Sequence, residues 1–190
     1  MKIAILGWGS LLWEGGPEFD RVHEPWQNDG PLLSLEFSRV SESRLGALTL
    51  VIDHAHGVPI NVAWCVSKRA TLEDALCDLR SREGTTLDKI GCTMIGVEVS
   101  ASDAEVPGGE VVAWARPKHL DAVIWTALSS NFHEKTTQSF AIEAALSHLK
   151  KLTPAGKSKA AEYIWRAPDF VKTPLRSAVQ REPWFAEVKS

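Results

Sequence analysis

The sequence has little of several features that would classify it quickly. It has one tyrosine and three cysteines, Cys65, Cys77 and Cys92, and no C-x-x-C pair. An odd number of cysteines without such spacing favours free thiols in a reducing compartment, so we expect a cytoplasmic protein. No apolar run approaches the ~18 residues of a membrane-spanning helix, and we expect no membrane partner.

Excess charge is also missing. The chain has 21 Lys and Arg against 24 Asp and Glu, a formal net charge of −3, with no basic run. This balance gives no electrostatic reason to expect nucleic acid as a partner. With 190 residues, 44% of them hydrophobic, the chain is long enough to bury a core. We expect a single domain over residues 1–190, with a β-rich body (1–115) and a mainly helical extension (116–190) packed on it.

The patterning along the chain predicts an α+β order of elements. Apolar and alternating runs predict strands over residues 2–6, 32–40, 47–52, 60–66, 92–99 and 111–115. Turn residues at 56–59 predict a hairpin between the third and fourth of these strands, and a second turn is expected at 107–109. Helices are predicted over 71–83, within 136–152 and over 153–166. Segment 117–128 fits either a helix or a strand, and the proline-bearing tail is expected to wrap without folding alone.

The predicted helix over 71–83 carries the most informative residue. Leu72, Ala75, Leu76 and Leu79 fall on one face at helical spacing. Glu83 lies four residues beyond Leu79 and continues that apolar stripe, so the stripe aims its carboxylate at the core or at a cleft. Desolvation of such a carboxylate favours its protonated form, which suits a general acid/base. A frayed last turn with Glu83 turned to water or paired with Arg82 is the alternative.

The first predicted strand ends in a glycine-rich loop, Gly7-Trp8-Gly9-Ser10-Leu11. Glycines let the backbone approach a ligand, and consecutive N–H groups can form an anion-binding nest. A dinucleotide-binding fingerprint would need a third glycine at position 12, where this chain has leucine. The loop therefore predicts either a small-ligand site or a plain tight turn.

These residues resemble a known family. The run from Gly7 to Trp13 is similar to the G-Y-G-S-L-x-W signature of γ-glutamylcyclotransferases, and within that family to the ChaC-type branch. Arg82-Glu83, at the end of a helix that follows several strands, resembles the R-E motif of the family. The resemblance covers roughly residues 1–115. It implies a mixed β-sheet or barrel body with one catalytic-site helix, whereas the helical C-terminal third predicted from the patterning lies outside the resemblance.

The resemblance also implies an activity. Glu83 would be the catalytic acid/base, and Gly7, Trp8, Gly9, Ser10 and Leu11 would bind a γ-glutamyl peptide or amide. The α-amine of the substrate would attack its own γ-carbonyl and release 5-oxoproline and an amine, with no cofactor and no metal. The chain departs from the family where Trp8 replaces a tyrosine and where no tyrosine follows Glu83. These departures favour the alternative, an inactive member that binds a small ligand or a protein.

Three other readings stay open at this stage. His54 and His56 could form a metal pair on a strand, or belong to a polar turn. One of the three cysteines could act as a nucleophile with a histidine, although buried inert thiols explain them as well. Arg176 could clamp a carboxylate or lie in a solvated tail. The tryptophans of the C-terminal third could cover a pocket or form an interface, which leaves a homodimer open.

Overall fold

The fold is described from a computed structural model of the chain, which defines residues 1–96 and 108–189. The chain divides into two compact units, each made of two separate stretches. Unit 1 comprises Met1–Leu33 and Asn61–Leu128, and unit 2 comprises Ser34–Ile60 and Ser129–Ser190. Each unit contains one β-sheet, and both sheets are open. The described residues therefore form two separate sheets and no closed barrel, so the barrel expectation is not met.

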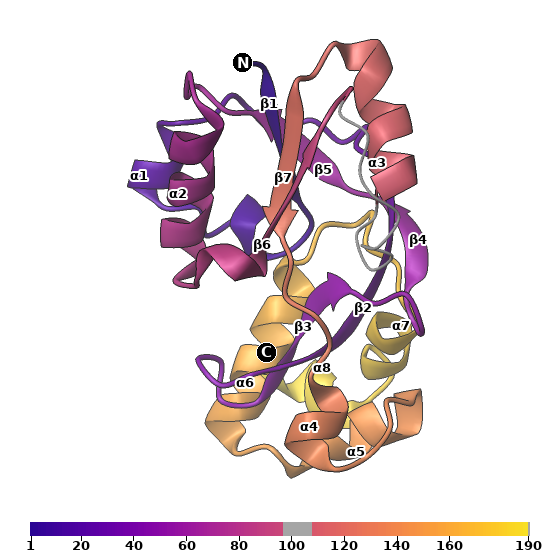
Figure 1. Ribbon diagram of the computed structural model, residues 1–190. Coiled ribbons are helices and arrows are strands. Elements are labelled where there is room, and N and C mark those ends of the chain that lie inside the picture. Colours follow the sequence, from indigo (N-terminus) through magenta and orange to yellow (C-terminus); the bar gives the residue numbers. More distant parts are fainter. Residues whose placement is uncertain (97–107, 190) are drawn as a thin grey trace. The chain divides into compact units, whose positions relative to one another are not determined.

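Unit 1 is built on a four-stranded mixed sheet (Figure 1). Its strands, in spatial order, are β5 (Ala63–Val66), β1 (Ile3–Gly7), β7 (Ala122–Thr126) and β6 (Ile90–Met94). β1 runs antiparallel to β5 and parallel to β7, which in turn is antiparallel to β6. All five residues of β1 are buried, as expected for a central strand with helices on both faces.

Helices cover the two faces of this sheet. Figure 1 shows α1 (Pro17–Asp20) and α2 (Leu72–Glu83) on one face and α3 (Gly108–Ala115) on the other. The short helices η1 (Ser10–Leu12), η2 (Leu87–Lys89) and η3 (Arg116–Lys118) lie in the connections. The core under α2 joins side chains of that helix to β1 and β7, among them Leu79, Ile5 and Ile124. Burial of this core fixes α2 on the sheet.

Unit 2 combines a three-stranded sheet with helices. The strands lie in the order β3 (Ala47–Ile52), β2 (Leu32–Ser41) and β4 (Val58–Asn61), with β2 antiparallel to β3. The helices are α4 (Phe132–Thr136), α5 (Ile142–Lys151), α6 (Pro154–Arg166), α7 (Pro174–Val179) and α8 (Pro183–Lys189). α6 packs against β3, and α5 and α8 pack against other helices of the unit. Helices are therefore present within 136–152 and over 153–166, as predicted.

Several predicted elements are confirmed and several are wrong. Strands near 2–6, 32–40 and 47–52 and helices over 71–83 and 153–166 are present, and segment 117–128 contains strand β7. The predicted hairpin is wrong, because β3 pairs with β2 and residues 60–66 divide between β4 and β5, which belong to different sheets. The helix predicted within 136–152 begins at Ile142, after Thr137 ends α4 in the left-handed conformation.

Residues 111–115 form part of a helix and not a strand. Val111 and Ala115 are fully buried at a spacing of four residues while Ala113 is exposed, which is a helical pattern. A five-residue apolar run does not distinguish a buried helix from a strand. A turn was predicted at 107–109, just before this segment. Pro107 lies outside the described residues, and Gly109 is helical. Residues 97–99, the end of the strand predicted over 92–99, also lie outside the described residues.

The tail contains two short helices. Pro174 and Pro183 are the first residues of α7 and α8. Proline is well suited to the first helical position, because the N–H group it lacks would have no intrahelical partner there. Two of the prolines noted in the tail therefore begin its helices.

Candidate functional site

Helix α2 is fixed at both ends by residues recognisable in the sequence. The Thr71 side chain accepts a hydrogen bond from the Asp74 N–H at 3.2 Å, and Gly84 ends the helix in the left-handed conformation with φ 60°. Both are the preferred residues for these positions. Ala75 and Leu79 are fully buried in the core. The predicted apolar stripe is confirmed, and it reaches the C-terminal turn that carries Glu83.

The Glu83 carboxylate lies in a nearly dry environment. Its side chain is 14% exposed, and that of Arg82 is 10% exposed. Arg82 Nη1 donates to Glu83 Oε1 at 2.7 Å. A carboxylate with this little water around it needs compensation, and the guanidinium supplies both charge and hydrogen bonding. The pairing of Glu83 with Arg82, which is part of the alternative prediction, is therefore present, whereas the frayed turn is not, because α2 extends through Glu83 and the side chain is mostly buried.

Arg82 also reaches the glycine-rich loop. Its Nη2 atom donates to the Glu14 carbonyl at 3.0 Å and lies 3.5 Å from Ser10 Oγ. Ser10 begins η1 directly after β1, so the guanidinium connects the end of α2 with the end of β1. Arg82 thus brings two predicted site elements, Glu83 and the 7–11 loop, into one hydrogen-bonded cluster.

The loop itself is tightly packed. Trp8 and Leu11 are each 5% exposed, and Leu11 belongs to the core that holds α2. A Cβ atom on Gly7 would come within 2.9 Å of Leu12 and of the Trp26 ring, so glycine is needed there for close packing. Of the five predicted substrate-binding residues, the structure places Ser10 at the Arg82 guanidinium.

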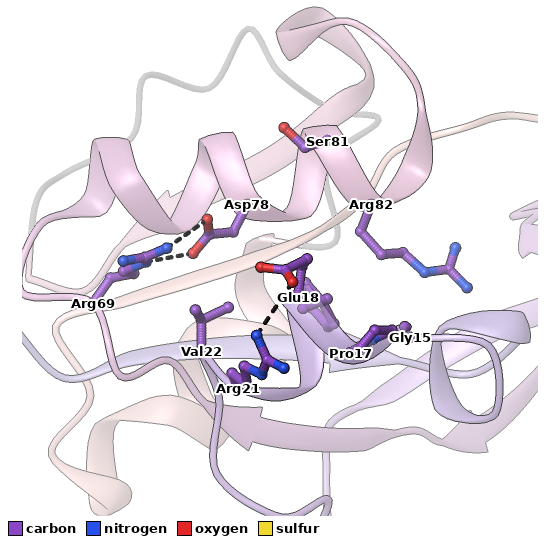
Figure 2. Close-up of a pocket in the computed structure, with 11 residues that line it drawn as sticks. Gly15, Pro17, Glu18, Arg21, Val22, Arg69, Asp78, Ser81 and Arg82 are labelled. Carbon is purple, nitrogen blue, oxygen red and sulfur yellow. Dashed lines mark hydrogen bonds and ion pairs between the residues drawn. The ribbon is translucent and has the colours of Figure 1, made fainter.

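A pocket of about 440 Å³ opens beside this cluster in unit 1 (Figure 2). Its walls come from the segment before α1, from α1 and from the outer face of α2. The lining residues are Gly15, Gly16, Pro17, Glu18, Phe19, Arg21, Val22, Arg69, Asp78, Ser81 and Arg82. Arg82 is the residue that the pocket shares with the Glu83 cluster. In Figure 2 its guanidinium points away from Arg69 and Asp78.

The metal reading finds little support, and neither does a nucleophilic role for Cys65, whereas Cys77 is partly buried and Cys92 is exposed. His56 lies in a turn after β3, with Nδ1 3.2 Å from Asp53 Oδ1, and Asp53 also accepts the N–H groups of Ala55 and His56. Within residues 1–96 and 108–189, no group of three or more His, Cys, Asp or Glu side chains could hold a metal ion. Cys65 is fully buried, and this burial raises the pKa of its thiol, which disfavours the nucleophilic thiolate.

Arg176 is a structural residue of unit 2. Its side chain is mostly buried, and the guanidinium donates to the carbonyls of Ala167, Pro168 and Val171 at 2.6–2.7 Å. These carbonyls belong to the connection between α6 and α7, which the arginine holds in place. The proposed carboxylate clamp is therefore replaced by an intramolecular role.

Sequence reasoning missed a buried carboxylate in unit 2. Glu36 on β2 is fully buried, with Oε1 accepting the Phe37 N–H at 2.8 Å and Oε2 accepting the Leu175 N–H at 3.3 Å. Burial raises the pKa of Glu36, although its hydrogen bonds act in the opposite direction. A lone acid inside the apolar strand run LLSLEF was the available signal. Its contacts indicate that Glu36 anchors the start of α7.

Comparisons with protein-family models, with curated proteins and with solved structures find no match to this chain. Among the residues that the structure describes, no helix combines the length and apolarity needed to cross a bilayer.

Proposed function

We propose that the chain is a γ-glutamylcyclotransferase-like enzyme that releases 5-oxoproline and an amine from a γ-glutamyl peptide or amide. The observation that carries the proposal is the cluster around Arg82. Through it, the poorly solvated Glu83 carboxylate and Ser10 of the loop after β1 share one guanidinium. The resemblance of these same two segments to the family motifs supplies the reaction class.

The reaction needs orientation and one proton carrier. The α-nitrogen of the substrate forms a bond to its γ-carbonyl carbon, and the bond from that carbon to the leaving nitrogen breaks. Glu83 accepts the proton lost from the α-nitrogen and returns it to the leaving amine, so the nucleophile comes from the substrate itself. A positioned carboxylate of this kind contributes ~10²–10⁴-fold to the rate. Holding the substrate in its cyclising conformation contributes the larger share.

The neighbours of Glu83 have separate roles in this proposal. Arg82 is a positioning residue that holds the carboxylate and ties it to the loop. Gly7, Trp8, Gly9, Ser10 and Leu11 form the substrate-binding segment, with the Ser10 hydroxyl nearest the guanidinium. No residue of the cluster needs to form a covalent bond to the substrate.

The experiment measures 5-oxoproline release by mass spectrometry from a panel of γ-glutamyl peptides and amines. We expect release by the wild-type protein and its loss, by at least a hundredfold, in Glu83→Gln. Glu73→Gln is the matched control, since Glu73 is an exposed residue in the first turn of the same helix. Undiminished turnover in Glu83→Gln would remove Glu83 from the mechanism.

A wild-type protein that releases no 5-oxoproline from any member of the panel would remove the enzyme proposal. If a panel member nevertheless raises the melting temperature, the chain binds the ligand without turning it over. The indole of Trp8, standing where the resemblance expects a phenol, is the residue that favours this second function.

A further inference from the structure

The pocket of Figure 2 displays both signs of charge on facing walls. Arg21 follows α1 and pairs with Glu18 at 3.2 Å, while Arg69 precedes α2 and pairs with Asp78 at 2.6 and 3.0 Å. Figure 2 shows these two ion pairs on either side of Val22. The third arginine of the lining, Arg82, turns its guanidinium away from these pairs and uses it for Glu83 and the Glu14 carbonyl. The two ion pairs therefore offer two guanidinium groups and two carboxylates within one cavity.

The two ion pairs differ in how firmly they are held. The Arg21 and Glu18 side chains are 72% and 90% exposed, so water already competes for their contact and a ligand can replace either partner at little cost. Arg69 uses Nε and Nη2 for Asp78, and these side chains are 43% and 22% exposed. A bidentate contact orients the guanidinium, and it leaves Nη1 available to a further acceptor.

Part of the remaining lining is apolar. Phe19, Val22 and Pro17 contribute hydrocarbon surface between the charged walls, and Phe19 is itself anchored in the core of unit 1. The volume of about 440 Å³ falls within the ordinary range for small-molecule sites. A small ligand with a short apolar part would fit within this space with room for water.

We propose that this pocket binds an α-amino acid with an apolar side chain as its free zwitterion. The ligand carboxylate would take the guanidinium groups of Arg21 and Arg69, its ammonium group would take Asp78 or Glu18, and its side chain would cover the apolar floor. An anion alone would leave its charge facing two carboxylates, and a cation alone would face two guanidinium groups. A zwitterion places a group of opposite charge against both the guanidinium groups and the carboxylates, and it adds no net charge to the pocket.

This inference goes beyond the proposed function, because it rests on the two ion pairs of the pocket and does not involve Glu83, although the pocket and the Glu83 cluster share Arg82. Its test uses leucine together with 4-methylpentanoate, which lacks the amine, and 3-methylbutylamine, which lacks the carboxylate. Binding is followed on the full-length protein by ¹H–¹⁵N NMR titration, which also reports the location through the amides of Gly15, Gly16, Asp78 and Ser81. We expect leucine to shift these amides with at least tenfold higher affinity than either analogue.

Variants separate the pocket from general effects of charge. Arg69→Gln and Arg21→Gln should each weaken leucine binding at least fivefold. Arg116→Gln changes an exposed arginine on η3 that does not line the pocket, and it should leave the affinity unchanged. Equal affinity for 4-methylpentanoate and leucine would overturn the zwitterion assignment. Wild-type titrations that shift none of the four amides would overturn the site itself.

Discussion

The Arg82–Glu83 pair yields a prediction about stability that does not depend on the substrate. The pair is 2.7 Å long, and its side chains are 10% and 14% exposed. Arg82→Gln removes the cation beside a poorly solvated carboxylate and one donor to the Glu14 carbonyl. Breaking such a pair from one side costs about 3 kcal/mol of unfolding free energy. Glu83→Gln keeps an oxygen acceptor and should cost about 1–2 kcal/mol.

The double variant isolates the interaction. Because it removes both charges together, its loss should be smaller than the sum of the two single losses by about 1.5–3 kcal/mol. The assay is urea unfolding followed by tryptophan fluorescence, with all four proteins measured at one pH and salt concentration. The matched control is the same cycle on Arg21 and Glu18, which are 72% and 90% exposed and should couple by less than about 0.5 kcal/mol. Equal coupling in both cycles would refute the view that Arg82 compensates a desolvated carboxylate.

Three further predictions concern the rest of the fold. Gly91→Ala should lower the free energy of unfolding by about 3 kcal/mol or more, because the new Cβ atom would overlap the buried Trp125 ring. Its control in urea unfolding is Gly109→Ala, whose new Cβ would have no atom of the described residues within 4 Å. Because burial raises the pKa of Glu36 above its ordinary 4.5, its contribution to stability is fully present below about pH 4.5 and is lost as pH rises through the folded-state value. Glu36→Gln should therefore flatten that part of the stability–pH curve, and a variant curve parallel to that of the wild type would contradict this assignment. Arg176→Lys should lower the free energy of unfolding by about 2–4 kcal/mol, since an ammonium group cannot reproduce the planar fork that reaches three carbonyls. An unchanged midpoint of urea unfolding would show that the guanidinium does not stabilise the connection between α6 and α7.

The sequence alone determined the elements whose ends are marked by capping residues, glycines or the spacing of apolar residues. Thr71 and Gly84 mark the ends of α2, and the spacing of its apolar residues predicted the buried face that Glu83 continues. The buried strand β1 and the turn after it followed from an apolar run that ends in glycine. These features depend on residues within about one helical turn of each other, so no distant contact was needed to predict them.

Only the tertiary structure decided which distant residues meet. The apolar run at 111–115 fits a buried helix as well as a strand, and its burial in the fold decided for the helix. Strand β3 could have paired with β2 or with the segment after it, and a local pattern does not tell which pairing is more stable. Arg82 shows the same limit at the candidate site, because its contact with Ser10 joins residues 72 positions apart. The sequence placed Arg82 beside Glu83 at the end of α2, but only the packing of α2 against the β1 sheet brought the loop after β1 to the Arg82 guanidinium.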